Sequence, residues 1–162
     1  MHIHEMLCKA HMMKKKAAMM AAKLAEMAPY VTWKEKLHHY HHHLMKHAEH
    51  LKSMMEGGHS TAAGAVEDVQ HHPPTFGDAL EMAHAHEMET ICLLHNILRI
   101  VPMVRMRVHI LMMMKEQMDY LVFLAQTATL LMEKKHHYPP DYGPPTPPPM
   151  PMPPYYPYPP KG

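Results

Sequence analysis

Cysteine, histidine and methionine are the residues of this sequence whose side chains most readily bind metal ions. The 162-residue chain contains 21 Met and 19 His but only two Cys. Both cysteines occur in a Cys-x-x-His motif, Cys8 with His11 and Cys92 with His95. On a helix, side chains three positions apart project from one side, so each pair could chelate one ion. Thioether and imidazole are ligands of soft and borderline metals, so copper(I) is the first expectation and zinc the second.

Glu87 and His47 are polar residues at positions where the pattern predicts an apolar helix face. Glu87 lies in the middle of a stripe formed by Leu80, Ala83, Ile91, Leu94 and Leu98. An ionised carboxylate on a core face is costly unless it is paired, hydrogen-bonded or bound to a metal. The alternative is a Glu at the edge of the stripe that reaches water or a lysine. His47, beside Leu44 and Leu51, is either a hydrogen-bonded core histidine or a metal ligand.

Four segments have the apolar periodicity of helices, at about residues 3–27, 32–56, 76–101 and 103–135. Pro29 separates the first two, and Thr32 with Glu35 fits a capping box at the start of the second. Thr75 with Asp78 predicts the cap of the third, and Pro102 predicts a turn, with a kink in one long helix as the alternative. We therefore predict an all-α fold: an antiparallel four-helix bundle of two helical hairpins over residues 1–137, with a crossover loop at 57–75.

Methionine is expected to fill much of the core, because the sequence has only two Phe and one Trp. In the first helix, a heptad column of Met6, Met13, Met20 and Met27 lies beside a column of Ile3, Ala10, Ala17 and Leu24. In the fourth helix, the periodicity predicts a buried face of Met103, Ile110, Leu111, Met114, Met118, Leu121, Ala125, Ala128 and Met132.

Residues 138–162 differ from the rest of the chain, with 13 Pro and five Tyr among 25 residues. This composition predicts an extended, polyproline-II-like C-terminal arm. The arm is either a solubilising end or a segment that contacts neighbouring subunits or another protein. We expect the protein to form a homo-oligomer.

Antiparallel hairpins with turns near residues 30 and 102 would bring candidate ligands to the same level. If the hairpins pack in register, one layer collects Cys8, His11, His47, His84, Glu87 and Glu116. A second layer collects Met20, His41, Cys92, His95 and His109. Bundles build metal sites from facing helices in this way. The predicted metal ligands are Cys8, His11, His47, His84, Glu87, Cys92, His95, His109 and Glu116.

Charge and motifs argue against several classes of protein. A net charge of +1 gives no indication of nucleic-acid binding. The longest apolar run without charge, residues 120–132, is too short to span a bilayer. No signal peptide is apparent at the start, so we expect a cytoplasmic protein. No catalytic Ser/His/Asp set, phosphate-binding loop or dinucleotide fingerprint is present, and we expect no enzymatic activity.

Three functions are compatible with these features. The first is non-catalytic binding or storage of copper or zinc. The second is a structural, self-assembling protein of the coat or filament type, whose tail binds neighbouring subunits. The third rests on Glu35-x-x-His38 and Glu81-x-x-His84, which resemble in letters the motif of ferritin-like di-iron bundles. Glu35, His38 and Glu81 are predicted to point away from the apolar stripes, so this resemblance extends to the architecture only.

Overall fold

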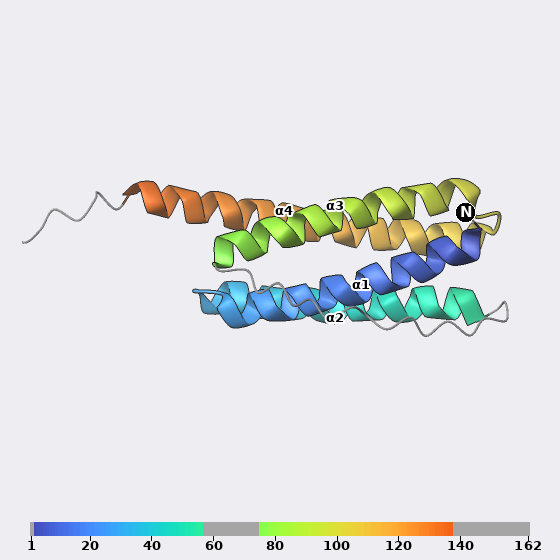
Figure 1. Cartoon of the computed structure of the whole chain (residues 1–162), viewed down its shortest axis with the longest axis horizontal. Coiled ribbons are helices and arrows are strands. Elements are labelled where there is room, and N and C mark those ends of the chain that lie inside the picture. The colour runs from blue at the N-terminus through green and yellow to red at the C-terminus, as the bar shows by residue number, and fades with distance from the viewer. Residues whose placement is uncertain (1, 57–74, 138–162) are drawn as a thin grey trace, which may run out of the picture.

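The structure, a computed structural model, describes residues 2–56 and 75–137. It contains four helices, α1 (Ile3–Met27), α2 (Val31–Glu56), α3 (Phe76–Ile100) and α4 (Val104–His137), and no strand within the described ranges. The helices form two antiparallel hairpins, α1–α2 and α3–α4 (Figure 1). The all-α prediction is confirmed, and each helix boundary lies within two residues of the predicted one. The predicted tail, 138–162, lies outside the described residues.

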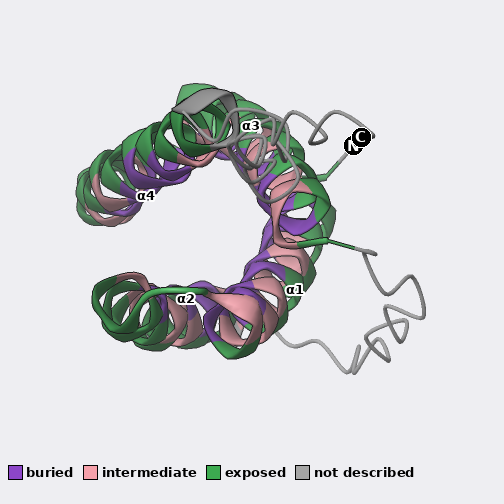
Figure 2. Ribbon diagram, turned by 90° about the vertical axis from the view of Figure 1, so that its left-hand side faces the viewer, coloured by how far each residue is buried: buried purple, intermediate pink, exposed green. Residues whose placement is uncertain are grey.

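Helix α1 packs against both α2 and α3, and α3 packs against α4. Viewed along the helices, the order α2, α1, α3, α4 follows an arc, with the buried residues facing its inside (Figure 2). Helices α2 and α4 lie at the two ends of the arc and approach each other less closely. The end of α2 and the start of α3 lie at opposite ends of the bundle (Figure 1). The segment between them, predicted as a crossover, lies outside the described residues up to residue 74.

The turn between α1 and α2 starts the second helix one residue earlier than predicted. The backbone N–H groups of Trp33 and Lys34 donate to the carbonyl oxygen of Tyr30 at 3.1 and 3.0 Å. Thr32 therefore lies within the first turn of α2. The predicted capping box at Thr32 is wrong, because a residue inside the helix cannot be its N-cap.

The boundaries of α3 follow the prediction. The Oγ1 of Thr75 accepts a hydrogen bond from the backbone N–H of Asp78 at 3.1 Å, which caps the helix. At the other end the N–H of Val101 donates to the carbonyl of Ile97. Pro102 lies in the short break before α4, so it marks a turn and not a kink.

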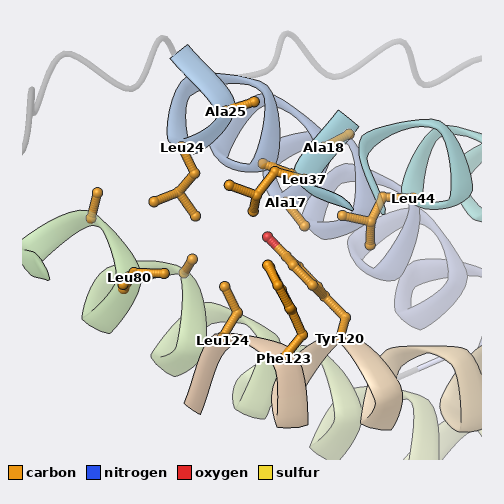
Figure 3. Packing of buried hydrophobic residues seen from close by; sticks show 13 residues of the cluster. Ala17, Ala18, Leu24, Ala25, Leu37, Leu44, Leu80, Tyr120, Phe123 and Leu124 are labelled. Atoms are coloured by element: carbon orange, nitrogen blue, oxygen red, sulfur yellow. The ribbon is translucent and has the colours of Figure 1, made fainter. Parts of the chain in front are cut away.

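The core consists of two apolar clusters, one towards each end of the bundle. The first cluster surrounds Leu24, Leu37, Leu80, Tyr120 and Leu124 (Figure 3). The second is built from Met6, Leu7, Ala10, Leu51, Leu94, Ile97, Val101, Ile110 and Met113. Helix α1 contributes mainly alanines, and those that are at most 2% exposed are Ala10, Ala17, Ala18, Ala21 and Ala25. These small residues allow α2 and α3 to approach α1 closely.

Methionine contributes less to the core than its abundance suggests. Only Met6 and Met113 are buried among the described residues. Half-buried methionines pack against both clusters, among them Met20, Met45, Met54 and Met114, so the predicted thioether core is confirmed only at its edge. In α1 the Ala10, Ala17 and Leu24 column is buried, whereas the methionine column is half-buried beyond Met6. Within residues 2–56 and 75–134, eight methionines are exposed: Met12, Met19, Met82, Met88, Met103, Met112, Met118 and Met132.

The predicted buried face of α4 is also wrong for most of its length. Leu111, Met118 and Met132 are more than half exposed. The residues that are buried are Ile110, Met113, Gln117, Tyr120, Leu121, Phe123, Leu124 and Thr127. Apolar residues occur on two faces of this helix, so periodicity alone does not identify the core face. The face that packs inward is the one that contains Gln117, which is hydrogen-bonded to Lys14 of α1 and to Glu87 of α3.

Close packing around α1 predicts that a larger side chain at Ala21 will be poorly tolerated. We expect Ala21→Leu to lower the free energy of unfolding by about 2 kcal/mol, because the added atoms overpack a fully buried site. The control is Ala85→Leu on the exposed side of α3, which should change stability little. Urea unfolding monitored by circular dichroism measures both. Equal effects of the two substitutions would contradict the packing described.

Candidate functional site

Polar side chains form a layer between the two apolar clusters. Lys14 of α1, Glu87 of α3 and Gln117 of α4 are each at most 1% exposed, and His47 of α2 is 6% exposed. Along every helix these residues fall between the positions that build the first and second clusters. All four helices therefore contribute to one buried polar layer.

Gln117 links a buried cation to a buried carboxylate. The Nζ of Lys14 donates to Oε1 of Gln117 at 2.6 Å. The Nε2 of Gln117 donates to Oε2 of Glu87 at 2.5 Å and to the backbone carbonyl of Glu87 at 3.0 Å. The Lys14 Nζ and the nearest Glu87 oxygen are 4.0 Å apart. The amide is oriented so that its carbonyl faces the ammonium group and its NH₂ faces the carboxylate.

Burial pushes both ends of this network towards their neutral forms. It lowers the pKa of Lys14 from 10.5 to about 8, although Glu87 and Glu116 partly oppose the shift. It also raises the pKa of Glu87, against the opposing effects of Lys14, His86 and Gln117. Oε1 of Glu87 is buried without a hydrogen-bond partner in the described part of the chain. Pairing between Lys14, Gln117 and Glu87 therefore offsets a large free-energy cost of removing the two charged groups from water.

Glu116 connects α4 to α2 on the more open side of the polar layer. Its Oε2 accepts hydrogen bonds from Nδ1 of His43 at 3.0 Å and from Nε2 of His47 at 2.8 Å. Histidines 43 and 47 are four residues apart, so both rings project from the same face of α2. With Tyr40 and Asp119 they line a pocket of about 150 Å³ between α2 and α4. A pocket of this size and polarity can hold water.

The pKa values of this group favour a neutral imidazole beside a carboxylate. Burial, followed by the charge of Lys14, lowers the pKa of His47 from 6.5 to about 4, despite its hydrogen bond with Glu116. Burial acts to raise the pKa of Glu116, but the hydrogen bonds and charges of His43 and His47 outweigh it and lower that pKa. An ionised Glu116 only accepts hydrogen bonds, so Nε2 is the protonated nitrogen of neutral His47.

A separate cluster of soft ligands lies where α1 begins and α2 ends. The Sγ of Cys8 is 3.5 Å from Nε2 of His4 and donates to Sδ of Met55 at 3.2 Å. His4 lies one helical turn before Cys8, and Met55 lies in the last turn of α2. The Cys8 side chain is half-buried. Thiol, imidazole and thioether thus converge at a site that solvent reaches.

The other predicted ligands of α1 and α2 form different contacts. Nδ1 of His11 donates to the carbonyl of Ala48 at 2.8 Å, which matches the predicted hairpin register, whereas Cys8 contacts Met55. His41 makes the same contact with the carbonyl of Ala18, also at 2.8 Å. These two bonds tie α2 to α1.

The predicted ligands of the second hairpin are dispersed. Cys92 and His95 are exposed, and His84 lines a hollow between α3 and α4. The ring of His109 stacks on that of His50 with a centroid distance of 6.0 Å. Of the predicted first layer, His47 and Glu116 are hydrogen-bonded to each other, and Glu87 is bonded to Gln117 in the same polar layer. Within residues 2–56 and 75–137, no three His, Cys, Asp or Glu side chains are placed to hold a metal ion by themselves.

Lys14, Gln117 and Met55 are the important residues that sequence reasoning missed. Lys14 and Gln117 are polar residues in heptad columns that are otherwise apolar. Seven positions before and after Lys14 are the buried residues Leu7 and Ala21, and seven positions before and after Gln117 are Ile110 and Leu124. Glu87 occupies the same kind of position between Leu80 and Leu94. This pattern, a polar residue with apolar residues seven positions before and after it, could have identified Lys14 and Gln117 from the sequence. No pattern identifies Met55, because a methionine on an apolar stripe resembles any other core residue.

Comparison with known proteins adds no assignment. The chain matches no model of a known protein family, and no curated protein matches it. None of the described helices has an apolar stretch long enough to cross a membrane.

Removing the buried cation should be costly at neutral pH. We expect Lys14→Met to lower the free energy of unfolding by about 3 kcal/mol, because it leaves Glu87 buried without a positive partner. Adding Glu87→Gln should restore part of the loss by removing the unpaired charge. The control is Lys16→Met on the exposed side of α1. If Lys14→Met lowers the free energy of unfolding in urea no more than Lys16→Met does, Lys14 is not part of a buried network with Glu87.

His47 should make stability depend on pH. Its pKa is depressed in the folded state, so the unfolded chain binds a proton more readily between pH 6.5 and about 4. Stability from a neutral His47 is therefore present above pH 6.5 and is lost as pH falls, by up to about 1.4 kcal/mol per pH unit. His47→Gln keeps a donor for Glu116 and should flatten this slope, whereas the exposed His38→Gln should not. If the free energy of unfolding in urea changes with pH equally in His47→Gln and in the unmodified protein, the depressed pKa of His47 is refuted.

Proposed function

We propose that this protein binds copper(I) in a non-catalytic binding or storage role, with zinc as the second candidate metal. The observation that supports the proposal is the convergence of Cys8, His4 and Met55. Thiolate and thioether sulfur are the ligands that select copper(I), and imidazole also suits copper. A methionine sulfur is not among the usual ligands of zinc, which ranks zinc second.

The position of the cluster suits a binding site that fills and empties. His4 and Met55 lie near helix ends, where small adjustments of backbone and side chains cost little. Cys8 is half-buried, so an ion can reach the sulfur without opening the core. Binding would replace the Cys8 S–H proton, since the thiolate is the ligand, and would release that proton to solvent.

The cluster lies apart from the buried polar layer. Lys14, Glu87 and Gln117 are hydrogen-bonded in one network, and Nε2 of His47 is bonded to Glu116. Neither Glu-x-x-His pair faces the core, because Glu35, His38 and Glu81 are exposed. A di-iron centre of the ferritin type therefore has no inward-facing ligands at these positions.

Copper(I) titration under anaerobic conditions, in competition with a chromogenic copper(I) chelator, tests the proposal. We expect about one tightly bound ion per chain at this cluster. Cys8→Ser should weaken binding by at least about 100-fold and Met55→Leu by about tenfold, since loss of outer-shell groups alone costs 10–100-fold.

Two matched controls locate the site. Cys92→Ser removes the other thiol, which is exposed, and Met88→Leu removes an exposed thioether. Both variants should bind copper(I) as the unmodified protein does. Equal losses from Cys8→Ser and Cys92→Ser, or no tight binding in the unmodified protein, would refute the proposal. Zinc bound more tightly than copper(I), and insensitive to Met55→Leu, would make zinc the physiological candidate.

A further inference from the structure

Helix α4 carries a second apolar stripe that no part of the described structure covers. The stripe follows alternating steps of four and three residues, and all nine of its members are exposed: Val104, Val108, Leu111, Lys115, Met118, Val122, Ala125, Thr129 and Met132. Six of these are large apolar side chains that are between 48% and 74% exposed. The stripe extends over 28 residue steps, which corresponds to about 42 Å. Helix α4 lies at the end of the arc, and on its outer side none of the other three described helices packs against it (Figure 2).

The spacing of this stripe is that of a coiled-coil seam. One row of the seam contains Val108, Val122 and Thr129, which are β-branched. The other contains Leu111, Met118 and Met132, which are long and flexible, together with Val104 and Ala125. Two such rows at alternating spacings of four and three residues allow the knobs-into-holes packing of a coiled coil. The hydroxyl of Thr129 donates to the carbonyl of Ala125 at 3.0 Å, so this polar group needs no further partner.

We propose that the α4 stripe pairs with the α4 stripe of a second copy of this chain, with the two helices antiparallel. This inference is independent of the proposed copper site. The heptad spacing requires a helical partner, because knobs from one helix fill holes between four residues of another. The chain's own residues 138–162 are a competing occupant, but the polyproline-II helix that their composition predicts would repeat every three residues and would not match the seam. Helix α2 offers no comparable face, since its exposed positions are mostly His, Lys and Glu.

Charge determines the orientation. In a parallel pair, Lys115 would face Lys115 of the second copy within the seam. In an antiparallel pair it faces the small Ala125, which leaves space for its aliphatic stem to reach water. The same arrangement brings the exposed Arg105 near Glu133 of the second copy. Asp119 approaches its own counterpart, but Lys115 lies one turn earlier on the same helix and offsets that charge.

The oligomeric state of seam variants tests the pairing. We expect a dimer by sedimentation equilibrium at micromolar concentrations. Met118→Glu should raise the dimer dissociation constant at least about 100-fold, since it places a carboxylate in the seam. Because Met118 is exposed in the chain itself, the variant should keep the helix content of the unmodified protein. The matched control, Met88→Glu at an exposed position of α3, should remain dimeric.

Other outcomes would overturn the proposal. A monomer at all concentrations, or a Met118→Glu variant that dimerises normally, would exclude this interface. Deletion of residues 138–162 should leave the dimer intact, and loss of the dimer on that deletion alone would identify the tail as the contact.

Disulfide cross-linking distinguishes the two orientations. In a background lacking Cys8 and Cys92, Val108→Cys chains should not cross-link with one another. A mixture of Val108→Cys and Met132→Cys chains should cross-link, because these positions face each other in the antiparallel pair. Efficient cross-linking of Val108→Cys chains alone would instead require a parallel pair.

Discussion

A lysine and a glutamate buried on different hairpins constrain the whole bundle. Lys14 lies on α1, Glu87 on α3, and Gln117 of α4 bonds to both. Buried charges are tolerated only when they are paired, so the hairpins must dock in the register that joins these residues. A slip of one heptad would place an apolar residue of α1 beside Glu87 and leave both charges unpaired. The polar layer therefore specifies the register, as a single polar residue does in coiled coils.

The helices were predictable because their signals are local. Prolines 29 and 102, the Thr75 cap and the apolar periodicity define four helices and two turns, and all are found close to the predicted positions. The buried face of a helix was less predictable where the helix has apolar residues on more than one of its sides. In α4 two stripes have helical spacing. The buried stripe is the one in which Gln117 bonds to Lys14 and Glu87 and Tyr120 packs in the first apolar cluster. That choice depends on tertiary contacts, which periodicity does not contain.

The candidate site was predictable only in part. Glu87 was identified from its place on an apolar stripe, but its partner Lys14 was not, since lysines on α1 look like a solvated face. Cys8 was expected to pair with His11, yet His11 bonds to the Ala48 carbonyl and Cys8 meets Met55 instead. Methionine carries different roles at different places in this chain. It fills the core at Met113, offers a thioether at Met55, and forms an exposed seam on α4 around Met118.

The most direct test of this account is the pKa of Lys14, measured by NMR titration of a side-chain-labelled sample. Its signal can be assigned by its disappearance in Lys14→Met. A buried Lys14 paired through Gln117 with Glu87 predicts a titration midpoint near pH 8. It also predicts a further decrease in Glu87→Gln, because Glu87 is the main group that stabilises the charged form. A midpoint at 10.5, unchanged by Glu87→Gln, would show that Lys14 reaches solvent and that the polar layer does not join the hairpins.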